Sequence, residues 1–268
     1  SFKEMRLMES SGLVEIQSHA KSHTWYFKGS KIVDFWRPGS ATQKGGPVWM
    51  LWNAFPEEKP YYLTKAAELE HKIPYGTPIY EHGKSLETTR FFPEDIILQE
   101  KLIARVASEK DFFNHKDWKN ILNSIVDLES DIKGEFESES DYLKRVEVEL
   151  KDSKAIIEEG LGHEIKGVCW PGGGVKEKVV EIAKKLGYSY FTLPSKWKRS
   201  PNNLYSEMIP RIGPLSRLTF KGRDIGEPSA LDFSLYLKSH NGNKLAKWGF
   251  FVKRLIKFLS YELSSFFK

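Results

Sequence analysis

The stretch from Ile165 to Leu193 constrains the fold more than any other part of the sequence. It begins and ends with runs of apolar, β-branched and aromatic residues that are typical of buried strands. Between these runs, the turn Pro171–Gly174 leads into a helical pattern from Lys176 to Leu186, which Gly187 ends. A strand, a helix and a second strand in this order predict parallel pairing through a right-handed crossover, and therefore an α/β fold.

Helical periodicity is found on both sides of this stretch. Apolar residues recur at helical spacing among charged ones from Ser140 to Gly160, which is typical of a helix that covers a sheet. Many Gly, Pro and aromatic residues over 24–92 predict irregular structure there. Further helices are expected at 93–108, 116–128 and 229–238, and short strands at 48–52 and 208–212.

Two histidines follow a predicted strand near the N-terminus. Ser1 and Glu4 form a capping-box pattern that begins a short helix. The β-rich run from Leu13 to Gln17 then leads directly into His19 and His23. This is the position at which α/β folds place chemistry.

The spacing of these histidines suits a metal site. Two neutral imidazoles in one loop can hold a divalent ion such as zinc and leave room for a carboxylate and a water molecule. Seven histidines placed at random in a chain of 268 residues would give about 0.2 such HxxxH pairs, so the spacing alone is a weak signal. Ordinary polar loop histidines are the alternative.

The composition excludes some classes of protein. Basic and acidic residues, 41 and 36 in number, are interleaved, so that a formal charge of +5 does not imply nucleic-acid binding. The single cysteine, Cys169, excludes an intrachain disulfide. The fold must therefore be held by packing and by any metal that it binds.

A family resemblance links these observations. The segment from Ser11 to His23 resembles the second motif of the polysaccharide deacetylases, the NodB-type carbohydrate esterases. In that family a helix precedes this strand and both motif histidines bind the metal. His19 and His23 match those positions, whereas Ala20 stands where the family usually has Ser or Thr. The resemblance therefore implies a zinc-type metal site at His19 and His23.

Two later segments also resemble this family. The Trp170-Pro171 turn and the helix after it are similar to the third motif and the next βαβ step. Trp170 stands near the family's usual arginine, so the resemblance assigns Trp170 and Pro171 to the wall of the substrate pocket, with plain core as the alternative for Trp170. Ile209–Ile212 resembles a short late strand in which Arg211 pairs with a site carboxylate. A surface arginine at a strand edge explains that match equally well.

The family's first motif, a strand that ends in Thr-Phe-Asp-Asp-Gly and supplies the catalytic base and a metal ligand, is absent from the 268 residues. Its expected place lies before Ser1, so the sequence predicts a domain that lacks its first strand and has little activity by itself. Asp34, Asp224 and Asp232 occupy ordinary turn or helix contexts and are not assigned to its role. His240, in a polar turn, is a poor candidate for the general acid.

The expected fold is α/β: a distorted, incomplete (β/α) barrel of the polysaccharide deacetylase type, without its first strand. It extends over residues 1–240, with a large insertion at 24–137, and a C-terminal amphipathic helix occupies 241–268. The aromatic content of the insertion suits stacking on sugar rings or an ordinary core, and its His82 is an additional residue that can approach the site.

The resemblance implies metal-dependent hydrolysis of N- or O-linked acetyl groups on a glycan, at the cell envelope or outside the cell. A metal at His19 and His23 would polarise the acetyl carbonyl and lower the pKa of a bound water. A family aspartate would take the proton of that water, and a backbone N–H would stabilise the oxyanion.

Two alternatives stay open. A catalytically silent glycan-binding or scaffold protein could keep the fold without the acidic strand. An unrelated metalloenzyme could complete the histidine pair with Asp34 or Glu81. Separately, the apolar face of the helix at 245–267 suits either packing against protein or peripheral contact with an anionic membrane.

Overall fold

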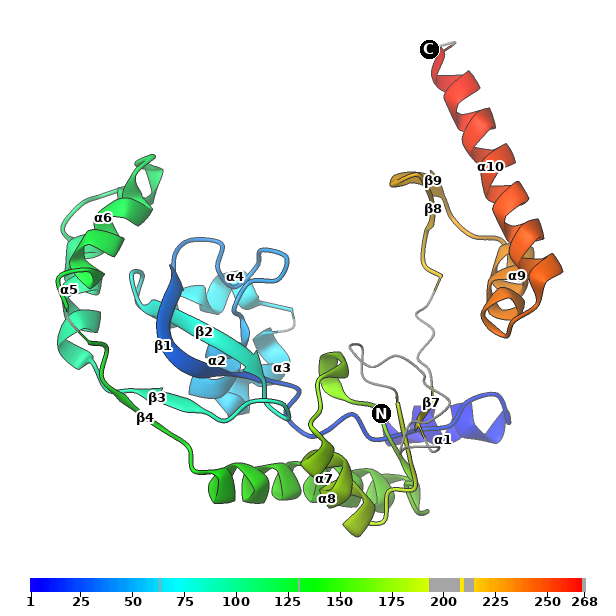
Figure 1. Cartoon of the computed structure of the whole chain (residues 1–268), viewed down its shortest axis with the longest axis horizontal. Coiled ribbons are helices and arrows are strands. Elements are labelled where there is room, and N and C mark those ends of the chain that lie inside the picture. The colour runs from blue at the N-terminus through cyan, green and yellow to red at the C-terminus, as the bar shows by residue number, and fades with distance from the viewer. Residues whose placement is uncertain (63, 130, 193–207, 210–214, 267–268) are drawn as a thin grey trace. The chain divides into compact units, whose positions relative to one another are not determined.

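The computed structural model describes residues 1–62, 64–129, 131–192, 208–209 and 215–266. The chain divides into two compact units, an N-terminal unit (Ser1–Ile209) and a C-terminal unit (Pro210–Lys268) (Figure 1). The division predicted from the sequence lies at residue 240. Within the C-terminal unit, α9 (Ala230–His240) packs against α10 (Lys244–Phe266).

The N-terminal unit contains a parallel sheet, a helical cover and a long insertion. Its helices are α1 (Phe2–Ser10), α2 (Trp49–Ala54), α3 (Lys59–Tyr62), α4 (Ala66–Leu69), α5 (Ile96–Ala107), α6 (Trp118–Val126), α7 (Glu139–Leu161) and α8 (Glu177–Lys185). Its strands are β1 (Trp25–Phe35), β2 (Pro78–Lys84), β3 (Phe91–Pro93), β4 (Gly134–Phe136), β5 (Gly167–Val168), β6 (Tyr190–Thr192) and β7 (Met208–Ile209).

The helix ends follow the capping signals of the sequence. Ser1 and Glu4 make both hydrogen bonds of the capping box at α1, as predicted. Asp95 caps α5 through the amide of Leu98, and α7 begins at the N-cap Ser138. The predicted positions of α5 to α8 are confirmed to within a few residues.

The central sheet is parallel and short. Strands β5, β6 and β7 pair in that order, with Gly167 opposite Tyr190 and Phe191 opposite Met208. The predicted βαβ unit is therefore confirmed. The strand expected at 13–17 is wrong, because Ser18 alone makes a parallel bridge, to Val168. Strand β5 is two residues long and offers no ladder along which a longer strand could pair.

One face of this sheet carries the core. Val168, Phe191 and Met208 are buried beneath α7 and α8 in a cluster that includes Leu150 and Val180. The other sheets in the described residues are two-stranded and antiparallel, and no sheet among those residues closes on itself. The molecule is thus a mixed α/β protein.

The insertion at 24–137 is more ordered than its composition predicts. Strands β1 and β2 pair antiparallel across the intervening segment 36–77, where irregular structure was expected. The strand predicted at 48–52 is wrong, since Trp49–Ala54 forms α2. A short apolar run does not distinguish a buried strand from a buried helix, and here Trp49, Met50 and Leu51 all pack into one aromatic cluster with Trp36.

The C-terminal unit has its own small core. A hairpin of β8 (Leu218–Phe220) and β9 (Arg223–Gly226) packs with α9 (Ala230–His240) and α10 (Lys244–Phe266). Ser229 and Asp232 form a full capping box at the start of α9. No helix among the described residues is long and apolar enough to cross a membrane.

Candidate functional site

The loop that carries the two histidines begins at a tightly held residue, Ser18. This side chain is fully buried. Its amide donates to Gly167 O at 3.1 Å and its carbonyl accepts from the Cys169 amide at 2.8 Å. Its hydroxyl lies 2.9 Å from the hydroxyl of Ser153 on α7. The start of the loop is therefore fixed to both the sheet and its covering helix.

The ring of His19 is oriented by the neighbouring strand. Its Nδ1 lies 2.6 Å from the backbone carbonyl oxygen of Cys169. A carbonyl oxygen accepts and never donates, so Nδ1 carries the proton in this contact and Nε2 keeps a lone pair when the ring is neutral. This is the arrangement that commonly orients metal-binding histidines.

The loop then bends so that both imidazole rings meet. Ala20 and His23 adopt left-handed backbone conformations, with φ of 61° and 43°. Such conformations cost non-glycine residues about 1–3 kcal/mol each and concentrate at functional sites. The ring centroids of His19 and His23 lie 4.9 Å apart with an interplanar angle of 49°, and His23 also meets the edge of Trp25 at 5.5 Å.

A third metal ligand does not accompany the pair in the described part of the chain. No group of three or more His, Cys, Asp or Glu side chains that could hold an ion occurs there. Asp34 pairs instead with Arg37 at 2.7 Å and with Lys119 at 3.5 Å. His82 is exposed and contacts the ring of Trp49, with centroids 5.1 Å apart and planes tilted by 46°. The described residues thus offer two imidazole rings here, fewer than the three or four protein ligands of most zinc sites.

The other predicted site residues are less exposed than a substrate wall requires. Trp170 is fully buried and stacks on Phe191, with centroids 5.5 Å apart and planes 3° from parallel. Pro171 is also buried. Trp170 therefore lies in the core, while the backbone of its turn lies next to His19 through Cys169. Arg211 lies outside the described residues.

The glycine turn after β5, Pro171–Gly174, contacts a lysine that the sequence did not indicate. Lys84, at the end of β2, donates to Gly172 O at 2.5 Å. A Cβ at Gly174 would lie 2.4 Å from the Lys84 side chain and 2.5 Å from Glu87. These atoms are the far ends of flexible side chains, so a larger residue at Gly174 would have to move Lys84 and Glu87 but not the backbone of β2.

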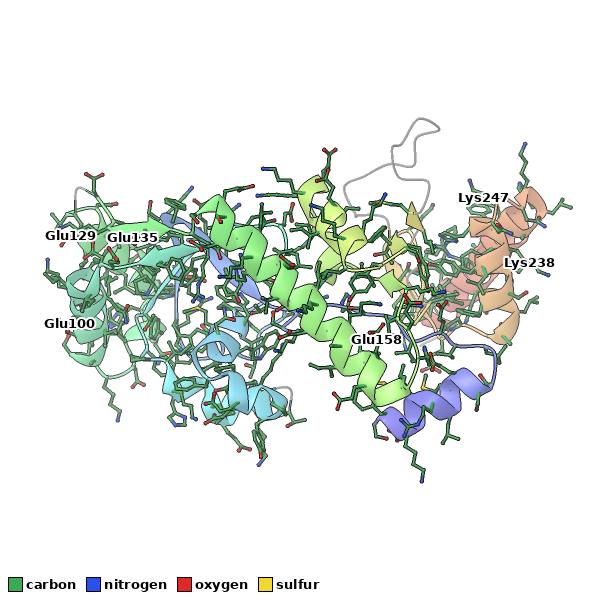
Figure 2. The ribbon with its side chains drawn as sticks, turned by 90° about the horizontal axis from the view of Figure 1, so that it is seen from below. Glu100, Glu129, Glu135, Glu158, Lys238 and Lys247 are labelled. Atoms are coloured by element: carbon green, nitrogen blue, oxygen red, sulfur yellow. The ribbon has the colours of Figure 1, made fainter. Side chains whose placement is uncertain are left out.

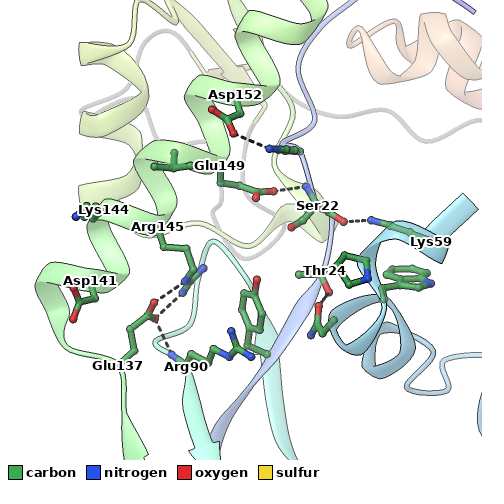
Figure 3. Close-up of a pocket in the computed structure, with 16 residues that line it drawn as sticks. Ser22, Thr24, Lys59, Arg90, Glu137, Asp141, Lys144, Arg145, Glu149 and Asp152 are labelled. Atoms are coloured by element: carbon green, nitrogen blue, oxygen red, sulfur yellow. Dashed lines mark hydrogen bonds and ion pairs between the residues drawn. The ribbon is translucent and has the colours of Figure 1, made fainter. Parts of the chain in front are cut away.

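A large cavity lies beside the histidine loop (Figure 3). Its volume is about 780 Å³, and its walls come from the loop, from α2 and α3, and from α7. Lys21, Ser22 and Thr24 of the loop line it, whereas His19 and His23 are not among its described lining residues. The remaining lining residues are Tyr26, Trp52, Asn53, Pro56, Lys59, Arg90, Glu137, Asp141, Lys144, Arg145, Val148, Glu149 and Asp152.

Charged contacts join the loop to both walls of this cavity. Lys21 pairs with Asp152 of α7 at 2.7 Å. Lys59 of α3 donates to the carbonyl of Ser22 and lies 4.7 Å from the centre of the Trp52 ring. Burial lowers the pKa of the Lys59 ammonium group. The histidine loop is thus held between the insertion and α7.

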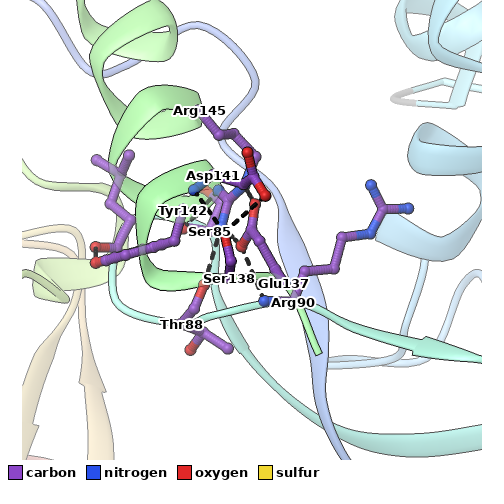
Figure 4. A network of polar contacts seen from close by, with 9 residues as sticks. Ser85, Thr88, Arg90, Glu137, Ser138, Asp141, Tyr142 and Arg145 are labelled. Atoms are coloured by element: carbon purple, nitrogen blue, oxygen red, sulfur yellow. Dashed lines mark hydrogen bonds and ion pairs between the residues drawn. The ribbon is translucent and has the colours of Figure 1, made fainter. Parts of the chain in front are cut away.

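Arg145 of α7 lines the cavity and takes part in a network of polar contacts (Figure 4). Its guanidinium group binds Glu137 through two hydrogen bonds, of 2.7 and 2.8 Å, and donates to the carbonyls of Ser85 and Thr88 at 2.9 and 3.0 Å. Burial raises the pKa of the Glu137 carboxyl, but the bonds from Arg145 and the Arg90 amide outweigh it, and the net pKa is lowered. The pair is therefore ionised at neutral pH and cross-links α7 to the insertion.

Sequence reasoning missed Lys59, Lys84 and the Arg145–Glu137 pair. The contact between Lys59 and Ser22 spans 37 positions, and that between Arg145 and Ser85 spans 60. No local pattern indicates such partners, because lysine and arginine at exposed helical spacing are ordinary surface residues.

No protein-family model and no curated protein matches the chain. Two solved structures resemble it: a de-N-acetylase from Aggregatibacter actinomycetemcomitans, with 13% identity and a TM-score of 0.39, and the BpsB deacetylase domain from Bordetella bronchiseptica, with 16% identity and a TM-score of 0.40. Each match covers 79% of this chain and 47% of the other. The chain thus spans about half the length of the structures it matches. With TM-scores below 0.5, the function has to be argued from the residues of this chain.

Proposed function

We propose that this chain carries the metal-binding half of a polysaccharide deacetylase-type site and acts in the removal of N- or O-linked acetyl groups from a glycan, on an incomplete (β/α) barrel. One observation supports the proposal above all others. The rings of His19 and His23 lie 4.9 Å apart beside the parallel sheet, and Cys169 O holds the Nδ1 proton of His19.

The residues that hold the ion would be His19 and His23. Zn–N bonds are about 2.0–2.1 Å long, so two rings at this separation can share one ion. A bound zinc supplies a Lewis acid that polarises the acetyl carbonyl and lowers the pKa of water. The Cys169 carbonyl keeps the His19 proton on Nδ1, and Ser18, buried beneath α7, fixes the start of the loop.

The glycan in this proposal lies along the loop and in the adjoining cavity. Asn53 and Lys59 line this cavity with polar groups for sugar hydroxyls, and Trp52 lines it with an indole ring. The Trp170-Pro171 turn supports His19 through the backbone. The role of Arg211 beside a site carboxylate stays a prediction from the resemblance.

Metal content tests the ligand assignment. We expect the wild-type chain, loaded with zinc and passed through a desalting column, to retain about one ion per chain, and His19→Ala/His23→Ala to retain almost none. His71→Ala/His240→Ala, which removes two exposed histidines, is the matched control and should bind like wild type. Equal zinc in wild type and in the His19/His23 variant would remove the assignment.

Acetate release separates the hydrolase from a catalytically silent binding protein. Acetylated oligosaccharides would be incubated with the zinc-loaded chain, and both free acetate and bound glycan would be measured. Because the family's catalytic aspartates are not among the 268 residues, the proposal expects only slow acetate release, which is lost in His19→Ala/His23→Ala while glycan binding persists. Glycan binding that releases no acetate, equally strong in both proteins, would favour the silent glycan-binding alternative.

A further inference from the structure

Helix α10 exposes a row of apolar side chains. Leu245, Trp248, Ile256 and Leu259 are 85%, 70%, 59% and 51% exposed. Their spacings of three, eleven and fourteen positions from Leu245 are close to whole numbers of helical turns, so these four side chains lie on one face. We call these four residues the α10 stripe.

The opposite side of α10 makes the contacts with its own unit. Ala246 and Phe250 are buried, and Phe250 packs in one cluster with Phe220 and Ile225. Lys257 donates to Glu227 O at 2.8 Å, and Lys253 pairs with the buried Asp232 at 3.0 Å. Helix α10 therefore packs in its unit through Phe250, Leu255 and Phe258 together with these charged contacts, and the α10 stripe is not part of that cluster.

Charge is divided unevenly along the chain. Residues 210–268 contain 11 of the 41 basic residues but 4 of the 36 acidic ones, a formal charge of +7, whereas residues 1–209 carry −2. Lys238, Lys244 and Lys247 are exposed on α9 and α10. Figure 2 shows Lys238 and Lys247 extending away from the ribbon of these helices. The unit that exposes the α10 stripe is thus also the cationic one.

We propose that the α10 stripe and the lysines beside it dock the chain onto an anionic lipid surface. A helix of 23 residues is about 35 Å long and is too polar to span a bilayer, but it has the apolar face and basic flanks of a helix that lies in the plane of the interface. Trp248, on the stripe, belongs to the residue type that favours the headgroup region.

The charge argues against two other occupants. In a second copy of the chain, residues 210–268 would bring another formal charge of +7 to the contact, and two surfaces of the same charge repel each other. A neutral glycan offers neither the apolar area nor the negative charge that this surface complements. An anionic lipid surface offers both.

Vesicle co-sedimentation of the full chain tests the proposal. Vesicles of phosphatidylcholine with 30% phosphatidylglycerol would be compared with pure phosphatidylcholine. We expect binding at least tenfold stronger to the anionic vesicles, weakened by added salt. Leu245→Ser/Trp248→Ser/Ile256→Ser should lose at least tenfold in binding. Lys244→Gln/Lys247→Gln should also lose at least tenfold, since each surface charge contributes about fivefold.

Matched controls come from the N-terminal unit. Ile96, Ile97 and Leu128 are 69%, 67% and 85% exposed, and their triple serine variant should bind vesicles like wild type. Lys110→Gln/Lys116→Gln is the charge control. Failure to bind anionic vesicles, or equal losses in test and control variants, would overturn the proposal. Self-association in solution that the α10 triple variant abolishes, without vesicle binding, would assign the stripe to a second copy instead.

Discussion

Helices α7 and α10 are both 23 residues long and both amphipathic, yet they use their apolar faces in opposite ways. Helix α7 buries Tyr142, Val146 and Leu150 in the main core. Helix α10 exposes Leu245 and Trp248 and packs through its other side. An apolar stripe in the sequence therefore does not show whether the core of the same chain covers that face of the helix.

The two helices also differ in how they treat charge. On α7, the side chain of Arg145 is 21% exposed and pairs with Glu137, which precedes the helix and is 7% exposed. This ion pair ties the helix to the insertion beside the histidine loop. On α10, Lys253 reaches the N-cap region of α9 through Asp232. Both helices use an ion pair as a cross-link, but the one on α7 borders the candidate site.

The largest expected effect is at Arg145. Arg145→Met leaves the Glu137 carboxylate buried without its partner, so we expect a loss of about 3–5 kcal/mol in the free energy of unfolding. Urea denaturation would measure it. Because Glu137→Gln/Arg145→Met removes both charges, this double variant should recover much of the loss. A cost below about 1 kcal/mol for Arg145→Met would show that α7 does not depend on the pair.

The second largest effect is expected for the buried apolar face of α7. Leu150→Ala should lower the free energy of unfolding by about 2–4 kcal/mol, because this fully buried side chain leaves a cavity in the main core. Leu245→Ala, on the α10 stripe, should change it by less than about 0.5 kcal/mol. Urea denaturation of both variants checks this. Equal costs would contradict the exposed placement of the α10 stripe.

A smaller effect is expected at Lys253. Burial raises the pKa of the Asp232 carboxyl, but its bonds to Ser229 and Lys253 outweigh this effect, so the net pKa is lowered. Lys253→Met should cost about 1 kcal/mol, because Asp232 keeps its capping bonds and Lys253 is partly exposed. A lowered carboxyl pKa stabilises the fold above the ordinary pKa near 3.8 and loses that contribution as the pH falls through the folded value. The deficit of Lys253→Met in urea denaturation should therefore shrink in acid.

The smallest expected effect is at the end of α7. His163 lies 2.8 Å from Glu9, and this bond raises the pKa of the imidazole. A raised histidine pKa stabilises the fold fully below the unfolded value near 6.5, and the contribution disappears as the pH rises through the folded value. The urea midpoint of wild type should thus exceed that of His163→Ala slightly at pH 6 but not at pH 8.5. An equal difference in urea midpoint at both pH values would show that titration of His163 does not contribute to stability.

Much of the candidate site was open to prediction from the sequence, but not all of it. The glycine turn at 171–174 and the histidine pair were found because each depends on neighbours within a few positions. The cavity and Lys59 were not found, because their partners lie tens of residues away. The Arg145–Glu137 pair is eight positions apart and was not found because Glu137 precedes the helix that carries Arg145, outside any i, i+4 pattern. The pairing of β1 with β2 was missed because the two strands are separated by α2 to α4.

The sequence by itself determined the local elements: the capped starts of α1, α5, α7 and α9, the βαβ unit, and the short HxxxH loop. These depend on backbone preferences and on hydrogen bonds between near neighbours. Only the tertiary structure decided that the rings of His19 and His23 meet beside Cys169 O, that Trp170 lies in the core, and that α10 exposes a row of apolar side chains. Each of these depends on which distant surface covers a given face, because burial is non-directional and favours any apolar partner of suitable shape.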